Sequence, residues 1–173
     1  MGTFFHFSGL EILIQAIPKI CAQLPEVEFL IIGDGAAREH YIEKVKEYGL
    51  SDRVCFTGYI ANHDLYRWLS ACDLALSPYN RLRLGQEDFT SYKIFEYLAC
   101  GLPVEISHER GGRNISYSPS YNLGATAPIE NTEAFVDAVL KVLQEKSYFT
   151  TDFKKRARAV LHSLNVTWEA LVN

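Results

Sequence analysis

Two acidic residues eight positions apart, Asp88 and Glu96, flank a short polar segment that contains Thr90, Ser91 and Lys93. The hydroxyl groups of Thr90 and Ser91 are suited to cap the free backbone N–H groups at the start of a helix. Those N–H groups and the positive end of the helix dipole attract anions, and Lys93 adds a full charge in the first turn. Glu96 lies three residues beyond Lys93, so both side chains can face the same way. We therefore expect a helix start that binds phosphates, with a carboxylate one turn deeper for sugar hydroxyls, as a nucleotide-sugar would require.

Five segments of the chain, in order, resemble sequence blocks of one enzyme family. Acids spaced as in 88–96 could also be solvated helix charges, but here they are similar to the acidic-x7-Glu motif of the retaining glycosyltransferases of the GT-B fold (glycosyltransferase group 1, or family 4). That large family includes sucrose-synthase-like and mannosyltransferase enzymes. The other four blocks are Leu30–Gly35, Leu50–Ile60, Cys72–Tyr79 and Trp168–Glu169. Each block is weak alone, and their shared order is what favours the family.

The resemblance implies the C-terminal half of a two-domain enzyme. The expected fold is a single Rossmann-like, three-layer α/β domain over residues 1–173, with a parallel, doubly wound sheet and no N-terminal acceptor domain in this chain. The expected reaction is retaining hexosyl transfer in glycan or polysaccharide biosynthesis, with the isolated domain inactive. The implied donor is a nucleoside-diphosphate sugar, and the implied partner is an acceptor domain of the same enzyme or of another chain. The family's chemistry implies no cofactor and no metal, and a cytoplasmic location with any membrane association through the missing half.

The resemblance also assigns roles to individual residues. Glu96 would accept hydrogen bonds from the ribose hydroxyls. Asp88 would contact the transferred sugar, although it is one methylene shorter than the Glu that is commoner in the family. These two are the expected catalytic residues, and the other expected donor contacts are Thr3, Tyr59, Ile60, Asn62, Thr90, Ser91, Tyr92 and Lys93. Alternatives remain open: Lys93 could be a solvated cation paired with Glu96, Tyr59 a core or rim aromatic, and Ser91 a helix cap.

One departure from the family pattern bears on catalysis. The loop at residues 3–9 carries no Arg or Lys, whereas family members usually have both there to neutralise the diphosphate leaving group. His6 could donate a hydrogen bond there, and Arg81, Arg83 or Arg110 could compensate from neighbouring loops. Because of this departure, one alternative function for the chain is a non-catalytic GT-B half that serves as a scaffold or partner module. A GT-B sugar-nucleotide epimerase fragment is a further alternative, which the order of blocks around Glu96 fits less well.

Apolar periodicity predicts alternating strands and helices along the chain. We expect helix 10–21 to be kinked or ended by Pro18, helix 36–48 to stop at Gly49, and a helix with an apolar stripe at Leu65, Trp68 and Leu69 to be capped by Asn62 or Asp64. The remaining helices are predicted at 91–100, 132–145, 150–162 and 167–172. Strands are predicted at 27–32, 53–57, 73–77, 103–107 and 123–126, and Gly2–Thr3 resembles the end of the first strand.

Whole-chain composition narrows the function classes. A length of 173 residues indicates one domain, and a net charge of −4 argues against a general nucleic-acid binder. No apolar run approaches the ~18 residues of a membrane span, and the first residues lack the pattern of a signal peptide. Cysteines 21, 55, 72 and 100 form no C-x-x-C pair and predict buried free thiols in a reducing compartment. No Asp-x-Asp metal motif occurs, and histidines 40, 63, 108 and 162 are expected at the surface.

Overall fold

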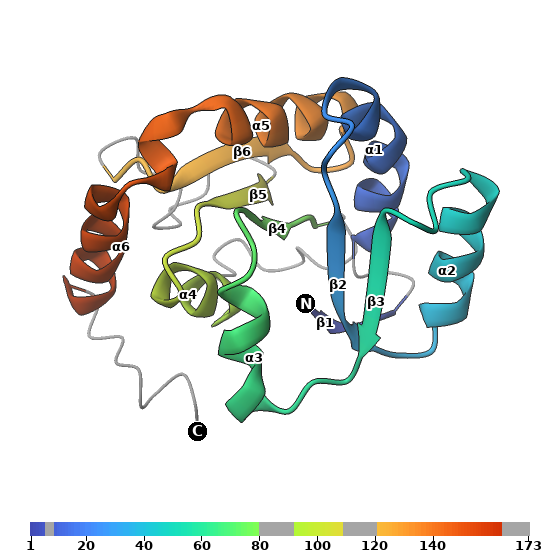
Figure 1. Cartoon of the computed structure of the whole chain (residues 1–173), viewed down its shortest axis with the longest axis horizontal. Helices are drawn as coiled ribbons and strands as arrows, with labels where there is room; N and C mark the ends of the chain where they lie inside the picture. The colour runs from blue at the N-terminus through green and yellow to red at the C-terminus, as the bar shows by residue number, and fades with distance from the viewer. Residues whose placement is uncertain (6–8, 80–91, 109–120, 164–173) are drawn as a thin grey trace.

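The computed structural model describes residues 1–5, 9–79, 92–108 and 121–163, in which strands and helices alternate (Figure 1). The strands are β1 (Gly2–Thr3), β2 (Phe29–Asp34), β3 (Val54–Gly58), β4 (Ala75–Ser77), β5 (Val104–His108) and β6 (Gly124–Pro128). The helices are α1 (Leu10–Gln23), α2 (Arg38–Glu47), α3 (Asn62–Leu69), α4 (Tyr92–Ala99), α5 (Thr132–Gln144) and α6 (Thr151–Ser163), with a short 3-10 helix, η2, at Lys146–Phe149. This order confirms the predicted α/β fold.

All described strand pairs are parallel, and they form two three-stranded sheets, β1-β2-β3 and β4-β5-β6. Read as β3-β2-β1 followed by β4-β5-β6, this is the strand order of a doubly wound α/β sheet. The division falls between β1 and β4. Among the described residues, β1 pairs with β2 through Gly2 with Gly33 and Thr3 with Asp34, and no strand pairing joins β1 to β4.

Helices cover both faces of the strands. One apolar cluster joins α1, α2, β2 and α5, with Ile17, Tyr41 and Phe135 fully buried within it. The second cluster joins β5 to α4 and α6, where Ile94 and Phe153 are fully buried. Figure 1 shows α1 and α5 side by side and α4 beside α6, and both helix pairs are in contact. These layers place the loops that follow the strands at one edge of the domain.

Local signals predicted most element ends. Pro18 lies inside α1, and the helix continues to Gln23, so of the two predicted effects Pro18 does not end the helix. Gly49 follows α2 with φ of 68°, in the left-handed region, which confirms the predicted stop. The predicted cap at Asn62 or Asp64 is wrong: the N-cap is Ala61, which offers no side-chain acceptor, and α3 begins at Asn62. The segment predicted as a helix at 167–172 lies outside the described residues.

The predicted state of the cysteines is only partly correct. All four thiols are free, but Cys55 is exposed and the other three are partly exposed, so burial was wrongly predicted. Flanking apolar residues misled that prediction, because in a strand or helix the neighbours of an exposed position can face the core. His40, His63 and His162 are exposed, as expected. Within the described ranges, no helix has the length and apolar character to cross a membrane.

Candidate functional site

The loops after β1 and β4 meet at the division between the two sheets. Gly9, which precedes α1, has φ of 78°, and a Cβ atom there would lie 2.5 Å from the carbonyl oxygen of Pro78. The turn after β2 also touches this region, because the amide of Ala37 donates to the carbonyl of Phe4 over 3.1 Å. In doubly wound sheets this point, beyond the carboxyl ends of the strands where the order reverses, is where ligands bind.

Lys93, in the first turn of α4, reaches back to β1. Its Nζ lies directly against Gly2, so that a side chain at residue 2 would displace it. One turn further along α4, the hydroxyl of Tyr97 accepts a hydrogen bond of 3.0 Å from the amino group of Met1. Burial raises the pKa of Tyr97, so this hydroxyl stays protonated. The first turns of α4 and the start of β1, at Met1 and Gly2, therefore lie together as one structural unit.

Glu96 is the carboxylate of this unit. Its side chain is half-buried, and desolvation by burial raises its pKa, while Lys93 and the amino group of Met1 lower it. The charge of Lys93 thus acts on Glu96, in keeping with their spacing along one helix face. A half-buried carboxylate beside an ammonium group is suited to accept hydrogen bonds from hydroxyl groups that complete its solvation.

The other described donor-site candidates lie on loops or edges at the same end of the strands. Thr3 is the exposed last residue of β1, and Tyr59 follows β3 with 78% of its surface exposed. Ile60 packs against the second apolar cluster, which leaves its backbone as the group that could contact a ligand, and Asn62 is exposed. Tyr92 is also 78% exposed, and its ring packs edge-on against Phe95 at 6.4 Å. The structure brings Lys93 and Glu96 together with Gly2 of β1, whereas Tyr59, Ile60 and Asn62 belong to the segment that leads from β3 into α3.

Several predicted residues lie outside the described part of the chain. They are Asp88, Thr90 and Ser91 of the polar segment, His6 of the first loop, and the three arginines Arg81, Arg83 and Arg110. Among the described residues of the 3–9 loop, Phe4 is buried and Phe5 is 42% exposed. The hydroxyl of Tyr41 donates to the carbonyl of Phe5 over 3.2 Å and lies 2.6 Å from Glu11. Sequence reasoning missed Gly2 and Tyr97, although a glycine in a short strand is a known indication of close approach by another group.

The described residues contain no group of three His, Cys, Asp or Glu side chains that could hold a metal ion.

Comparison with known proteins places the chain in a family. The profile of the family described as "Glycosyl transferases group 1" matches residues 1–145. The chain belongs to this family. It is 28% identical over 137 residues to a phosphatidyl-myo-inositol mannosyltransferase of Propionibacterium freudenreichii, an alignment that covers 79% of this chain and 32% of that protein. The chain therefore spans about a third of the length of this curated relative.

Solved GT-B glycosyltransferases share the fold. HepE from Anabaena, in complex with UDP, matches 95% of this chain with a TM-score of 0.72 at 21% identity, over 44% of its own chain. The C-terminal domain of the group 1 protein LpcC from Francisella tularensis matches 94% of this chain and 82% of its own, with a TM-score of 0.72 at 16% identity. The resemblance to this family and the GT-B domain fold that was expected from it are thereby confirmed.

Proposed function

We propose that this chain is the donor-binding, C-terminal domain of a retaining glycosyltransferase. Its ligand is a nucleoside-diphosphate sugar, and the acceptor is held by an N-terminal domain of the same enzyme or of a partner chain. The observation that carries the proposal is the unit formed by Lys93, Glu96 and Gly2 of β1, at the division where the sheet order reverses. The UDP in the HepE complex supports a nucleotide ligand for this fold.

Each part of the unit has a proposed role. The first-turn amides of α4 and the Lys93 ammonium bind the diphosphate, because both present positive charge at the start of a helix. Glu96 accepts hydrogen bonds from the ribose hydroxyls, which replace the water that its half-burial removes. Asp88, Thr90 and Ser91 complete the sugar and phosphate contacts, and no metal or cofactor takes part.

A scaffold role is the second candidate function, and the composition of the first loop favours it. Residues 3–9 include no Arg or Lys, so this loop supplies no fixed positive charge to a departing diphosphate. A domain of this kind would retain the fold and the contacts between domains while catalysing little or no transfer.

Calorimetric titration separates the two candidates. UDP, GDP and ADP are titrated into the chain, into Glu96→Ala, and into Asp137→Ala, which removes an exposed acid of α5 as a matched control. The proposal predicts that one of the three binds the parent and the control but binds Glu96→Ala at least tenfold more weakly, the cost of about 1.5–3 kcal/mol for charge-assisted hydrogen bonds. Absence of binding by all three nucleotides to the folded parent would favour the scaffold role instead.

A further inference from the structure

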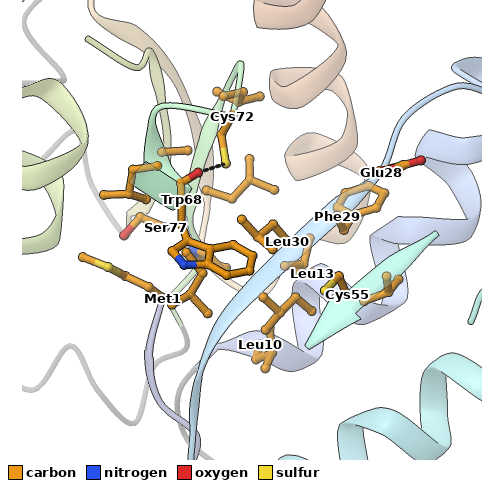
Figure 2. Close-up of a pocket in the computed structure, with 18 of the residues that line it drawn as sticks. Met1, Leu10, Leu13, Glu28, Phe29, Leu30, Cys55, Trp68, Cys72 and Ser77 are labelled. Carbon is orange, nitrogen blue, oxygen red and sulfur yellow. Dashed lines mark hydrogen bonds between the residues drawn. The ribbon is translucent and has the colours of Figure 1, made fainter. Parts of the chain in front are cut away.

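An apolar pocket of about 840 Å³ lies between the two sheets, and its lining includes Leu10, Leu13, Leu30 and Trp68 (Figure 2). It lies in line with β1, where a doubly wound sheet has its central strand. The lining therefore belongs to the core of the sheet and indicates no ligand. The outer surface of α6 has a different character, because charged side chains face solvent there.

Four exposed basic side chains of α6 form a stripe, which consists of Lys154, Lys155, Arg158 and His162. At 3.6 residues per turn, these positions fall on one face of the helix. The apolar side chains of α6 lie on the other face, where Phe153, Ala157, Val160 and Leu161 are buried in the domain. The basic stripe extends over about 12 Å along the helix axis. Figure 1 shows α6 at one edge of the molecule, far from α2.

The charge of α6 is opposite to that of the chain. The helix contains four Lys and Arg side chains and one Asp, a net charge of +3, whereas the whole chain has a net charge of −4. The residues outside α6 therefore carry a net charge of −7. Such a separation of charge gives the domain one face that attracts anions and other faces that repel them.

The basic side chains of other helices have acidic partners. Ion pairs join Lys19 to Glu133, Lys44 to Glu47 and Arg67 to Asp64. Across the described ranges, no ion pair includes a member of the basic stripe. The positive charge of α6 is thus available to an anionic partner.

The spacing within the basic stripe is unfavourable for the helix itself. Lys154 and Arg158 stand four residues apart, where like charges repel one another, and Lys155 and Arg158 stand three apart. The stem of Lys154 packs against Gly101, at the end of α4, where a cation is favourable to the helix dipole. That packing explains Lys154 alone, and an anionic partner would remove the repulsion among all three charges.

We propose that the basic stripe of α6 docks the domain on an anionic membrane surface. A lipid surface is favoured over an acidic protein because the stripe has no apolar side chain, and protein interfaces usually have an apolar core. Lys and Arg side chains gain more near a surface of anionic lipids than in single exposed ion pairs. The apolar face of α6 is already used by the core, so the helix would lie on the headgroups without entering the hydrocarbon.

Docking would also orient the candidate site. The acidic remainder of the chain is repelled by the same surface, so α6 would face the lipid. Because α6 contacts α4, the helix of Lys93 and Glu96 would be held at a fixed orientation to the membrane. The inference itself does not depend on nucleotide binding.

The test is sedimentation of the chain with vesicles of phosphatidylcholine, prepared with and without phosphatidylglycerol. The variant Lys154→Gln/Lys155→Gln/Arg158→Gln removes three charges of the basic stripe. The control Lys19→Gln/Lys44→Gln/Lys46→Gln removes the same charge from α1 and α2. We expect binding only to vesicles with phosphatidylglycerol, and less of it at high salt. The stripe variant should bind at least about tenfold more weakly than the parent, whereas the control should bind like the parent.

The thermal stability of the stripe variant shows whether its fold is kept. Its Tm should equal or exceed that of the parent, because the substitutions relieve repulsion within α6. Equal loss of binding in the two triple variants would overturn the proposal, since binding would then follow net charge. Absence of binding to phosphatidylglycerol vesicles at low salt would also overturn it, and binding to polyglutamate instead would indicate an acidic protein partner. Nucleotide is absent throughout, so these results leave the proposed donor site untouched.

Discussion

Glu105 lies in the middle of β5 and is fully buried, and neither of its carboxylate oxygens is hydrogen-bonded to a residue of the described ranges. In the strand register it stands between Leu76 of β4 and Ala125 of β6. Its neighbours Val104 and Ile106 belong to the apolar cluster of α4 and α6, so Glu105 faces the opposite side, which α5 covers. Desolvation by burial raises the pKa of Glu105 well above its ordinary value.

This burial makes the free energy of unfolding depend on pH. Below pH 4 the carboxyl holds its proton in both states and imposes no ionisation cost. As the pH rises through the unfolded pKa of about 4.3, the unfolded chain loses that proton while the folded chain keeps it, so folding becomes less favourable. The loss is about 1.4 kcal/mol per pH unit until the folded pKa is reached, or at most about 2.7 kcal/mol between pH 5 and pH 7.

Glu105→Gln removes the ionisation and keeps the size of the side chain. Urea unfolding is measured for the parent and for the variant at pH 5, 6 and 7. The buried amide of the variant has its own desolvation cost, but that cost does not vary with pH. The informative quantity is therefore how the difference in free energy of unfolding between the variant and the parent changes with pH. We expect the variant to gain stability relative to the parent at each step up in pH. Glu43→Gln, at an exposed position of α2, serves as the control and should show no such trend.

The prediction fails if the difference in free energy of unfolding between Glu105→Gln and the parent stays constant from pH 5 to pH 7. A constant difference would mean that the Glu105 carboxyl ionises equally in the folded and unfolded chains, and so is solvated or partnered in solution.

Three further predictions concern single positions. Gly9→Ala should lower the free energy of unfolding by about 2–4 kcal/mol in urea titrations, because the new Cβ would sit on a left-handed backbone and clash with Pro78. Gly49→Ala also has a left-handed backbone but has open space around it, so it should lower the free energy of unfolding by only about 1–2 kcal/mol. Equal losses for the two variants would contradict the clash at Gly9. Tyr148→Phe should lower the free energy of unfolding by about 1–3 kcal/mol in thermal unfolding, since the single hydroxyl hydrogen of Tyr148 is shared between Asn122 Oδ1 at 2.7 Å and the carbonyl of Gly124 at 3.0 Å, and an unchanged Tm would show that this hydrogen bonding contributes nothing net. Lys93→Met should leave the Tm nearly unchanged but weaken nucleoside-diphosphate binding about tenfold in calorimetry, with a smaller loss at high salt; undiminished affinity would remove Lys93 from the site.

The sequence predicted elements whose signals are local. Apolar spacing located the described helices to within a few residues, and Gly49 marked the end of α2 because glycine, which has no Cβ, adopts the left-handed backbone at little cost. The cap of α3 was misassigned because Asn62 is a favourable cap residue, yet the chain enters that helix one residue earlier, at Ala61.

Features that depend on distant contacts could not be predicted in this way. The approach of Lys93 to Gly2 requires β1 to lie beside the start of α4, and nothing in either segment encodes that distance. The burial of Glu105 depends on the packing of α5 over β5, while its own neighbours indicate only a strand. For the candidate site, the motif predicted Glu96 and Lys93, and the structure added Gly2, which leaves room for the Lys93 ammonium, and Tyr97, which accepts a hydrogen bond from the amino group of Met1.

The most direct test of the donor site is to map a bound nucleotide onto the chain. Backbone amide chemical shifts are recorded while the nucleoside diphosphate selected by calorimetry is added. We expect the largest shift changes at the amides of Thr3, Tyr59, Lys93 and Glu96, and none in α5. Binding that leaves these four amides unchanged and shifts those of α5 or α6 would contradict it.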